Sequence, residues 1–263
     1  MGVVNVTPDS FSDGGRFIDA DAAIAQGLAL IAEGADLLDI GGESTRPGSD
    51  AVSVEEEIAR IVPVINGLRA ATDRPISIDT RKAAVAEAAI NAGASLWNDV
   101  TALSGDPAAL ATAARLGVPV ILMHMQGQPQ TMQADPRYGD VVAEVCAYLA
   151  ERARLAMAAG VAREAISLDP GIGFGKTLEH NLALLSHIDA LAHLGFPVVL
   201  GVSRKRFIQG LDLSAIEPTD RLGGSIAAAL AGAQAGVDML RVHDVAQTAQ
   251  ALAVWQAIEA GRA

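Results

Sequence analysis

Residues 75–100 read PISIDTRKAAVAEAAINAGASLWNDV, and this stretch contains one complete unit of the fold. PISIDT (75–80) is a short apolar run of the kind that forms a buried strand. A helical segment near 82–92 follows, and a glycine turn at NAGAS (91–95) leads into a second candidate strand, SLWNDV (95–100). Strand, helix and strand in this order predict a βαβ unit with parallel strands.

The same alternation continues along the whole chain. Eight candidate strands occur, at GVVNV (2–6), DLLDIGG (36–42), PISIDT (75–80), SLWNDV (95–100), PVILMHM (119–125), ISLDPG (166–171), PVVLGVS (197–203) and MLRVHD (239–244). Eight helical segments lie near 19–34, 53–71, 82–92, 106–116, 140–160, 178–194, 218–235 and 245–260. Eight such units in 263 residues predict an α/β fold, a closed (β/α)₈ TIM barrel in which residues 1–263 form a single domain. An open doubly wound sheet is the alternative, which is weakened because no G-x-G-x-x-G fingerprint follows the first strand.

The composition agrees with this fold and limits the possible partners. Hydrophobic residues make up 51% of the chain and aromatic residues only 3%, so the core must be aliphatic, as in parallel strands covered by helices. A formal net charge of -12 argues against nucleic acid as a partner. We find no signal peptide and no apolar run of about 18 residues, so we expect no membrane span. The single cysteine, Cys146, rules out a disulfide within the chain and favours a reducing, cytoplasmic location.

Groups that carry charge or form hydrogen bonds stand near the end of almost every predicted strand. They are Asn5, Asp39, Glu43, Asp79, Asn98, Asp99, His124, Asp169, Ser203, Lys205, Arg241 and His243. In a TIM barrel the carboxyl ends of the strands form one rim, and that rim carries the active site. Each group alone also fits a structural hydrogen bond or a helix N-cap, but the whole set converges on the rim.

Two subsets of these groups suggest different ligands. Arg241 and His243 alternate on the last strand and therefore face the same side, with Asn5 beside them on the first strand. Such donors suit a phosphate or a diphosphate.

The second subset consists of Asp79, Asn98 and Asp169. Two carboxylates and an amide can bind the donor-rich edge of a flat heterocycle, and Lys205 can donate to a ring carbonyl or nitrogen. A two-metal hydrolase is the alternative use of these carboxylates. It is disfavoured because only His124 and His243 among the histidines stand at strand ends.

Two long, glycine-rich loops follow the first two strands, at NVTPDSFSDGGRF (5–17) and GGESTRPGSD (41–50). Loops of this kind hold substrate and exclude water in barrel enzymes. A disordered surface loop is the alternative, and Phe11 and Arg46 argue against it.

Eight collinear motifs together resemble the dihydropteroate synthases, enzymes of the folate pathway, over essentially the whole chain. The motifs are MGVVNVTPDSFSDGG (1–15), DIGGESTRPG (39–48), SIDT (77–80), NDV (98–100), MHMQG (123–127), DPGIGFGK (169–176), GVSRK (201–205) and RVHDV (241–245). The resemblance implies that 4-aminobenzoate joins the methylene carbon of 6-hydroxymethyl-7,8-dihydropterin diphosphate, that pyrophosphate leaves, and that Mg²⁺ assists. It also implies a homodimer and a target for sulfonamides.

The resemblance assigns roles residue by residue. The pterin would be held by Asp79, Asn98, Met123, Asp169 and Lys205, and the diphosphate by Asn5, Thr45, Arg241 and His243. Asn5 would hold Mg²⁺, and Asp13 and Thr45 would close over the reacting centre. The aminobenzoate pocket would be formed by Phe11, Arg46, Pro47, Phe174 and Lys205. Arg206 departs from the serine found in some family members, so a role of position 206 in binding the aminobenzoate carboxylate stays open.

Two other functions stay open at this level. The first is a pterin-binding methyltransferase domain, against which the NVTPDSF loop and RVHDV argue, because methyl transfer releases no diphosphate. The second is a catalytically silent barrel that binds pterin or a partner protein.

Overall fold

Eight short strands form the centre of the computed structural model, which describes residues 1–7, 20–44, 51–128 and 131–261. The strands are β1 (Gly2–Asn5), β2 (Leu38–Gly41), β3 (Ile76–Asp79), β4 (Leu96–Asp99), β5 (Val120–Met123), β6 (Ile166–Asp169), β7 (Val199–Gly201) and β8 (Met239–Arg241). Every one lies inside a segment that the sequence predicts as a strand, and each is shorter than predicted.

The strands follow one another around a closed circle. Strands β1 to β6 pair in parallel in chain order, and β7 pairs with β8. A parallel bridge between Leu168 and Val198 joins β6 to β7, and another between Gly2 and Val242 joins the end of β8 to β1. The second junction is held by backbone bonds from Val3 N to Val242 O and from Val242 N to Met1 O, each 3.0 Å long. The predicted TIM barrel is therefore confirmed.

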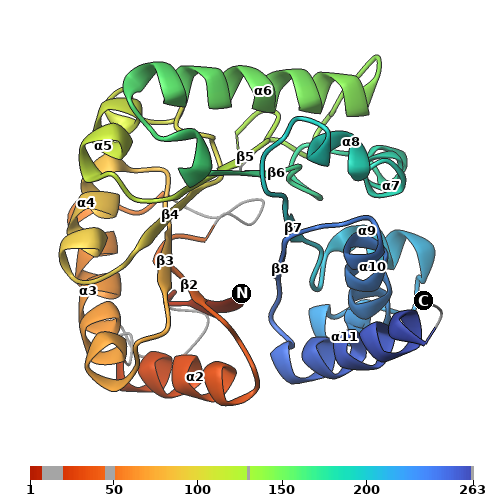
Figure 1. Ribbon diagram of the computed structural model, residues 1–263, viewed down its shortest axis with the longest axis horizontal. Helices are drawn as coiled ribbons and strands as arrows, with labels where there is room; N and C mark the ends of the chain where they lie inside the picture. Colours follow the sequence, from red (N-terminus) through yellow and green to blue (C-terminus); the bar gives the residue numbers. More distant parts are fainter. Residues whose placement is uncertain (8–19, 45–50, 129–130, 262–263) are drawn as a thin grey trace.

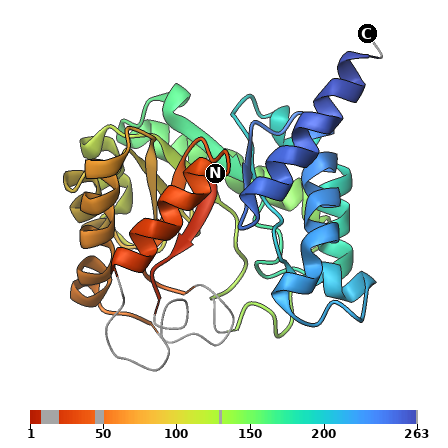
Figure 2. The ribbon, with the colours of Figure 1, turned by 90° about the horizontal axis from the view of Figure 1, so that it is seen from below.

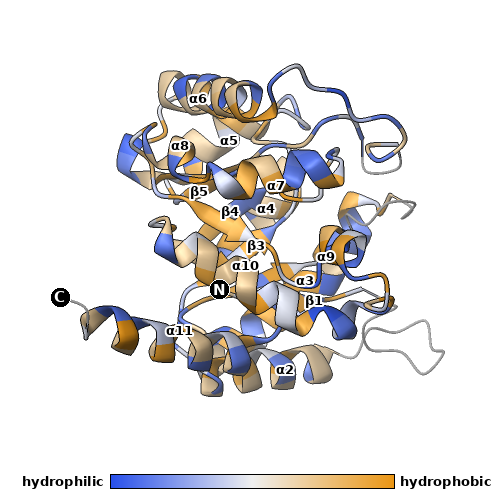
Figure 3. Ribbon diagram, turned by 90° about the vertical axis from the view of Figure 1, so that its right-hand side faces the viewer, coloured by the Kyte–Doolittle hydropathy of each residue, from blue (hydrophilic) through white to orange (hydrophobic). Residues whose placement is uncertain are grey.

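Helices surround the strands (Figure 1). They are α2 (Ala20–Ala32), α3 (Val54–Ala71), α4 (Ala83–Asn91), α5 (Ala109–Leu116), α6 (Val141–Ala159), α7 (Leu178–Ser186), α8 (Asp189–Ala192), α9 (Arg206–Leu211), α10 (Leu222–Gln234) and α11 (Val245–Ala260), with 3₁₀ turns η1 (Arg163–Ala165) and η2 (Pro218–Arg221). Figure 3 shows the apolar strands in the interior and mixed colouring on the helices, as amphipathic covering helices require. No helix in the described ranges is long and apolar enough to span a membrane.

The register of the parallel strands aligns three of the predicted site residues in one row. Asn5 lies opposite Gly41, which lies opposite Asp79, and Asp79 in turn lies opposite Asn98. Asn98 lies opposite Ile121 of β5, and Met123, two residues further along β5, lies opposite Asp169 of β6. All these residues lie at or next to the last residue of their strands, so the parallel sheet brings them to the same rim of the barrel.

The predicted helix over 178–194 is wrong as a single helix. The structure has α7 and α8 separated at His187 and Ile188, and His187 ends α7 with a φ of -126°. Ser186 Oγ bonds to Leu182 O, 2.7 Å away, and serine in this position competes with the backbone for its hydrogen bonds. Two further differences concern the region after β7. Helix α9 is not predicted because its six residues are too short for a periodic pattern, and the first turn of the predicted helix 218–235 is the 3₁₀ turn η2.

Candidate active site

A small cavity opens at the carboxyl ends of the strands. Its lining comes from β3, β4, β5, β6, β7 and β8 and the loops that follow them. The lining residues are Asp79, Asn98, Val100, Met123, Asp169, Gly171, Ile172, Phe174, Gly201, Lys205 and Arg241. All five residues predicted to hold the pterin are among them, together with Phe174 and Arg241.

Asp39, which does not line the cavity itself, bonds to two lining residues, Arg241 and Asn98. This carboxylate is fully buried, and its Oδ2 accepts from Arg241 Nε at 2.6 Å and from Asn98 Nδ2 at 3.1 Å. Arg241 also donates to Asp79 Oδ2 at 2.8 Å. The guanidinium therefore lies between two carboxylates, where it neutralises charge that would otherwise be costly to bury.

This arrangement differs from the separate diphosphate and heterocycle subsets drawn from the sequence. Arg241 faces the same cavity as Asp79 and is bonded to it, so the two subsets meet. Burial raises the pKa of the Asp79 carboxyl, and the Arg241 guanidinium opposes that rise. A ligand that donates to Asp79 would compete directly with Arg241.

Asp169 stands at the end of β6 with its carboxylate held by the chain that follows. Gly171 N donates to Asp169 Oδ1 at 2.7 Å, and burial raises the pKa of this carboxyl. Gly171 has a φ of 66°, and a Cβ there would lie 1.9 Å from His124 O, so only glycine is compatible with this approach. The other oxygen of Asp169 faces Gly201, where a Cβ would lie 3.9 Å from it.

Apolar side chains and a lysine also line the cavity. Lys205 Nζ lies 4.2 Å from the centroid of the Phe174 ring, within the range of a cation–π interaction. Burial and, to a smaller extent, Arg241 lower the pKa of Lys205 to about 8. Met123, 5% exposed, adds an aliphatic surface beside these groups.

Two predicted diphosphate residues, Asn5 at the end of β1 and His243 just after β8, lie outside the lining of this cavity. Asn5 Oδ1 and Asp79 Oδ2 each lie 3.9 Å from the position of a Cβ on Gly41, so the missing side chain leaves space between them. His243 Nδ1 lies 3.1 Å from Ser203 Oγ. Burial and, to a smaller extent, the nearby Arg241 lower the pKa of His243 to about 3, so the ring is neutral.

Some of the strand-end groups have structural partners instead. Asp99 is buried and accepts hydrogen bonds from Thr101 N, Thr101 Oγ1 and Leu103 N. This carboxylate organises the turn after β4, which is the structural role that the sequence left as an alternative.

Glu43 is a second such group. It accepts from Val52 N at 3.0 Å and forms ion pairs with Arg81 and Lys82, each 3.3 Å long. The side chain of Glu43 therefore connects the two ends of the loop after β2 to the start of α4.

Five predicted residues lie outside the described ranges. They are Phe11, Asp13, Thr45, Arg46 and Pro47. Sequence reasoning in turn missed several lining residues, namely Val100, Gly171, Ile172 and Gly201. Gly171 and Ile172 belong to the motif DPGIGFGK, whose repeated glycines were a usable signal of a loop lying close to other backbone.

Comparison with known proteins agrees with this site. A family model described as "Pterin binding enzyme" matches residues 1–243. The dihydropteroate synthase of Haemophilus influenzae is 48% identical over 258 residues, 98% of this chain and 92% of that protein. The solved dihydropteroate synthase of Xanthomonas albilineans with 4-aminobenzoic acid has a TM-score of 0.92 and 54% identity, covering 98% of this chain and 92% of that one. The same enzyme in complex with 7,8-dihydropteroate gives a TM-score of 0.87 at 51% identity, with 98% of this chain and 92% of that one covered. The chain therefore belongs to the pterin-binding enzyme family, and within it to the dihydropteroate synthases.

Proposed function

We propose that the cavity at the strand ends is where this transferase of folate biosynthesis joins 4-aminobenzoate to 6-hydroxymethyl-7,8-dihydropterin diphosphate, releasing pyrophosphate. The observation that carries the proposal is the combination of side chains in the cavity wall. Asp79, Asn98 and Asp169 supply acceptors, and Met123 and Phe174 supply apolar surface. A flat heterocycle with a donor-rich edge satisfies both kinds of group at once.

The pterin ring would bind with its edge on the carboxylates. Asp169 would accept from the ring through the oxygen that faces Gly201, since its other oxygen already accepts from Gly171 N. Asp79 would accept a ring donor in place of Arg241. Lys205 would donate to the ring carbonyl or a ring nitrogen.

Release of Arg241 from Asp79 would prepare the site for the diphosphate. The guanidinium would keep its bond to Asp39 through Nε, and its freed NH2 would donate to a phosphate oxygen. The neutral ring of His243 and the amide of Asn5 would add further contacts, with Thr45 of the second loop. Together these donors stabilise negative charge that develops as the C–O bond breaks.

Mg²⁺ is part of this proposal, with Asn5 as its protein ligand. The described residues contain no group of three or more His, Cys, Asp and Glu side chains placed to hold a metal. The amide oxygen of Asn5 fits Mg²⁺, which prefers oxygen ligands and commonly binds through one or two protein ligands, waters and substrate phosphates. When bound, the ion would supply positive charge to the departing pyrophosphate.

The second substrate would bind against Phe174 and Lys205. Phe11, Arg46 and Pro47 would complete this pocket, and Asp13 would lie near the cationic methylene carbon that pyrophosphate leaves behind. An aromatic amine is nucleophilic when neutral, so the site requires no strong base. The solved Yersinia pestis dihydropteroate synthase holds a sulfonamide drug, and we propose that a sulfonamide competes with 4-aminobenzoate here too.

Release of pyrophosphate tests the proposal. We expect release only when the pterin diphosphate, 4-aminobenzoate and Mg²⁺ are all present. Release that ignores 4-aminobenzoate would show a hydrolase, and pterin binding without release would show a silent barrel. Methyl transfer to or from a pterin would support the methyltransferase alternative.

We also propose a homodimer built through helices on one side of the barrel. Helices α10 and α11 pack against each other there (Figure 2). Val254 and Ile258 of α11 are 56% and 52% exposed, which supports an apolar contact with a second copy. Sedimentation of the protein and of Val254→Asp would test it: a dimer that the substitution dissociates is expected. That residues 1–263 form one domain and that the protein is cytoplasmic also remain predictions from the sequence.

A further inference from the structure

A lysine with almost no exposure lies behind the cavity wall. Lys176 is 3% exposed and follows Phe174 by two residues. In the described part of the chain its ammonium forms no ion pair. Burial lowers its pKa to about 7. A methionine or leucine would fill this space without the cost of burying a cation, so packing alone does not account for a lysine here.

The contacts of Lys176 join two loops of the rim. Its Nζ donates to His124 Nδ1 at 2.9 Å, just after β5, and to Gly171 O at 2.9 Å and Phe174 O at 3.0 Å, just after β6. Hydrogen bonds from a charged donor are stronger than those between neutral groups. One ammonium therefore links two backbone carbonyls of the loop after β6 to the imidazole of His124.

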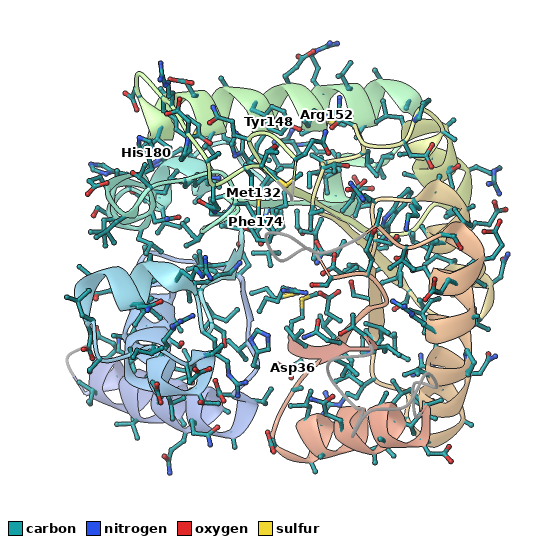
Figure 4. All side chains as sticks on the ribbon, turned by 180° about the vertical axis from the view of Figure 1, so that it is seen from behind. Asp36, Met132, Tyr148, Arg152, Phe174 and His180 are labelled. Carbon is teal, nitrogen blue, oxygen red and sulfur yellow. The ribbon has the colours of Figure 1, made fainter. Side chains whose placement is uncertain are left out.

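The loop it holds is pressed against its neighbour. A Cβ on Gly175 would lie 2.4 Å from Gln126 O, and one on Gly171 would lie 1.9 Å from His124 O, so both glycines lie too close to the neighbouring backbone for any side chain. Tyr138 Oη donates to Gly175 O at 2.9 Å, and Asn181 Oδ1 accepts from Gly173 N at 2.7 Å. Residues 171–175 therefore form a compact platform, and Phe174 projects from it toward the middle of the barrel (Figure 4).

Asp169, which precedes this platform, and Phe174, which belongs to it, are held in place differently. Asp169 belongs to β6 and is held by the sheet. The backbone of Phe174 has only loop partners, because its N donates to Gly171 O and its O accepts from Lys176. Loss of the ammonium would therefore affect the position of Phe174 more than that of Asp169.

We propose that Lys176 is a positioning residue for the second substrate: it fixes the 171–174 backbone against His124 and thereby sets the Phe174 ring that receives 4-aminobenzoate. This inference rests on the proposed function, because it takes Phe174 as a wall of the aminobenzoate pocket. Lys176 acts through Phe174 and does not touch the reacting atoms.

The test compares Lys176→Met with the same substitution at a half-buried arginine. Arg152 of α6 is the control, since its Nε donates to Ala102 O at 2.7 Å on the neighbouring loop, away from the platform (Figure 4). We expect Lys176→Met to raise the KM for 4-aminobenzoate on the order of tenfold to a hundredfold, as small misplacements of substrate-positioning groups do. The KM for the pterin diphosphate should change much less. Arg152→Met should leave both KM values near those of the unmodified protein.

Hydrogen exchange provides a readout that needs no activity. The amides of residues 171–176 should exchange faster in Lys176→Met and not in Arg152→Met. An unchanged KM for 4-aminobenzoate, or equal rises in the two variants, would overturn the proposal. If Lys176→Met does not fold, His124→Phe tests the proposal in its place. This substitution keeps an aromatic ring against Tyr148 but removes the imidazole nitrogen that accepts from Lys176. It should raise the KM for 4-aminobenzoate, and an unchanged KM would overturn the proposal. Inactivity of the unmodified protein would refute the proposed function instead, and the exchange comparison would then decide the role of Lys176.

Discussion

Replacing Asp39 by alanine should remove the most consequential buried charge in the molecule. Asp39 is fully buried and holds Arg241 at 2.6 Å and Asn98 at 3.1 Å through one oxygen. Removing one partner of a buried ion pair costs about 3–5 kcal/mol, and an unpaired buried donor such as the Asn98 amide about 1–3 kcal/mol. Arg241 keeps Asp79 at 2.8 Å and its side chain is 19% exposed, so we expect the lower end of both costs, about 4 kcal/mol in all.

Urea unfolding measures this loss, and the same strand region offers a matched control. Asp36 has a side chain that is 91% exposed and a 3.8 Å contact with Arg74, and Figure 4 labels it. An exposed pair of this kind contributes about 0–1 kcal/mol, so Asp36→Ala should hardly change the free energy of unfolding. A loss below about 1 kcal/mol for Asp39→Ala, equal to that of the control, would refute the central place given to Asp39.

Three further predictions concern single positions. Asn5→Ala should reduce Mg²⁺-dependent turnover sharply with little change in Tm, because the residue lies at the rim; normal turnover would exclude the metal role. Asp169→Asn should weaken binding of a pterin without diphosphate by about 1–3 kcal/mol in calorimetry, since the amide presents one mispaired donor; unchanged affinity would place the ring elsewhere. Burial and, to a smaller extent, Lys176 lower the pKa of His124 to about 3, so the unfolded chain binds more protons between pH 6.5 and 3 and acid must destabilise the fold. Between pH 7 and 5 this histidine should cost roughly 2 kcal/mol, so the fall in the free energy of unfolding should be smaller by that amount in His124→Phe, and equal falls would contradict the assignment.

The order of the fold was predictable because each strand is a short apolar run between polar turns. Parallel pairing then aligns strand ends without further information, which is why Asp79, Asn98 and Asp169 were expected at one rim and are found there. The break between α7 and α8 was not predictable from apolar periodicity, since it depends on the local hydrogen bonds of Ser186 and His187.

Neighbouring residues at a strand end have different roles, which the alternation of side chains along a strand predicts. Asn98 lines the cavity while Asp99 faces the turn after β4, and Met123 lines it while His124 bonds to Lys176. Successive side chains of a strand point to opposite faces, so only one residue of each neighbouring pair can face the cavity.

The contacts of Asp39 and Lys176 were beyond prediction for another reason. Asp39 meets Arg241 across a separation of 202 residues, and Lys176 meets His124 across 52. Such pairings depend on the closure of the barrel and on loop paths that the pattern of one segment does not contain.

A crystal structure of the protein with bound 7,8-dihydropteroate tests the central claim most directly, since that product contains the pterin and the aminobenzoate together. The account predicts the pterin ring between Asp79, Asn98 and Asp169, with Arg241 no longer bonded to Asp79 and the aminobenzoate ring against Phe174. A product bound outside this cavity, or an Arg241 still bonded to Asp79 beneath a bound ring, would contradict it.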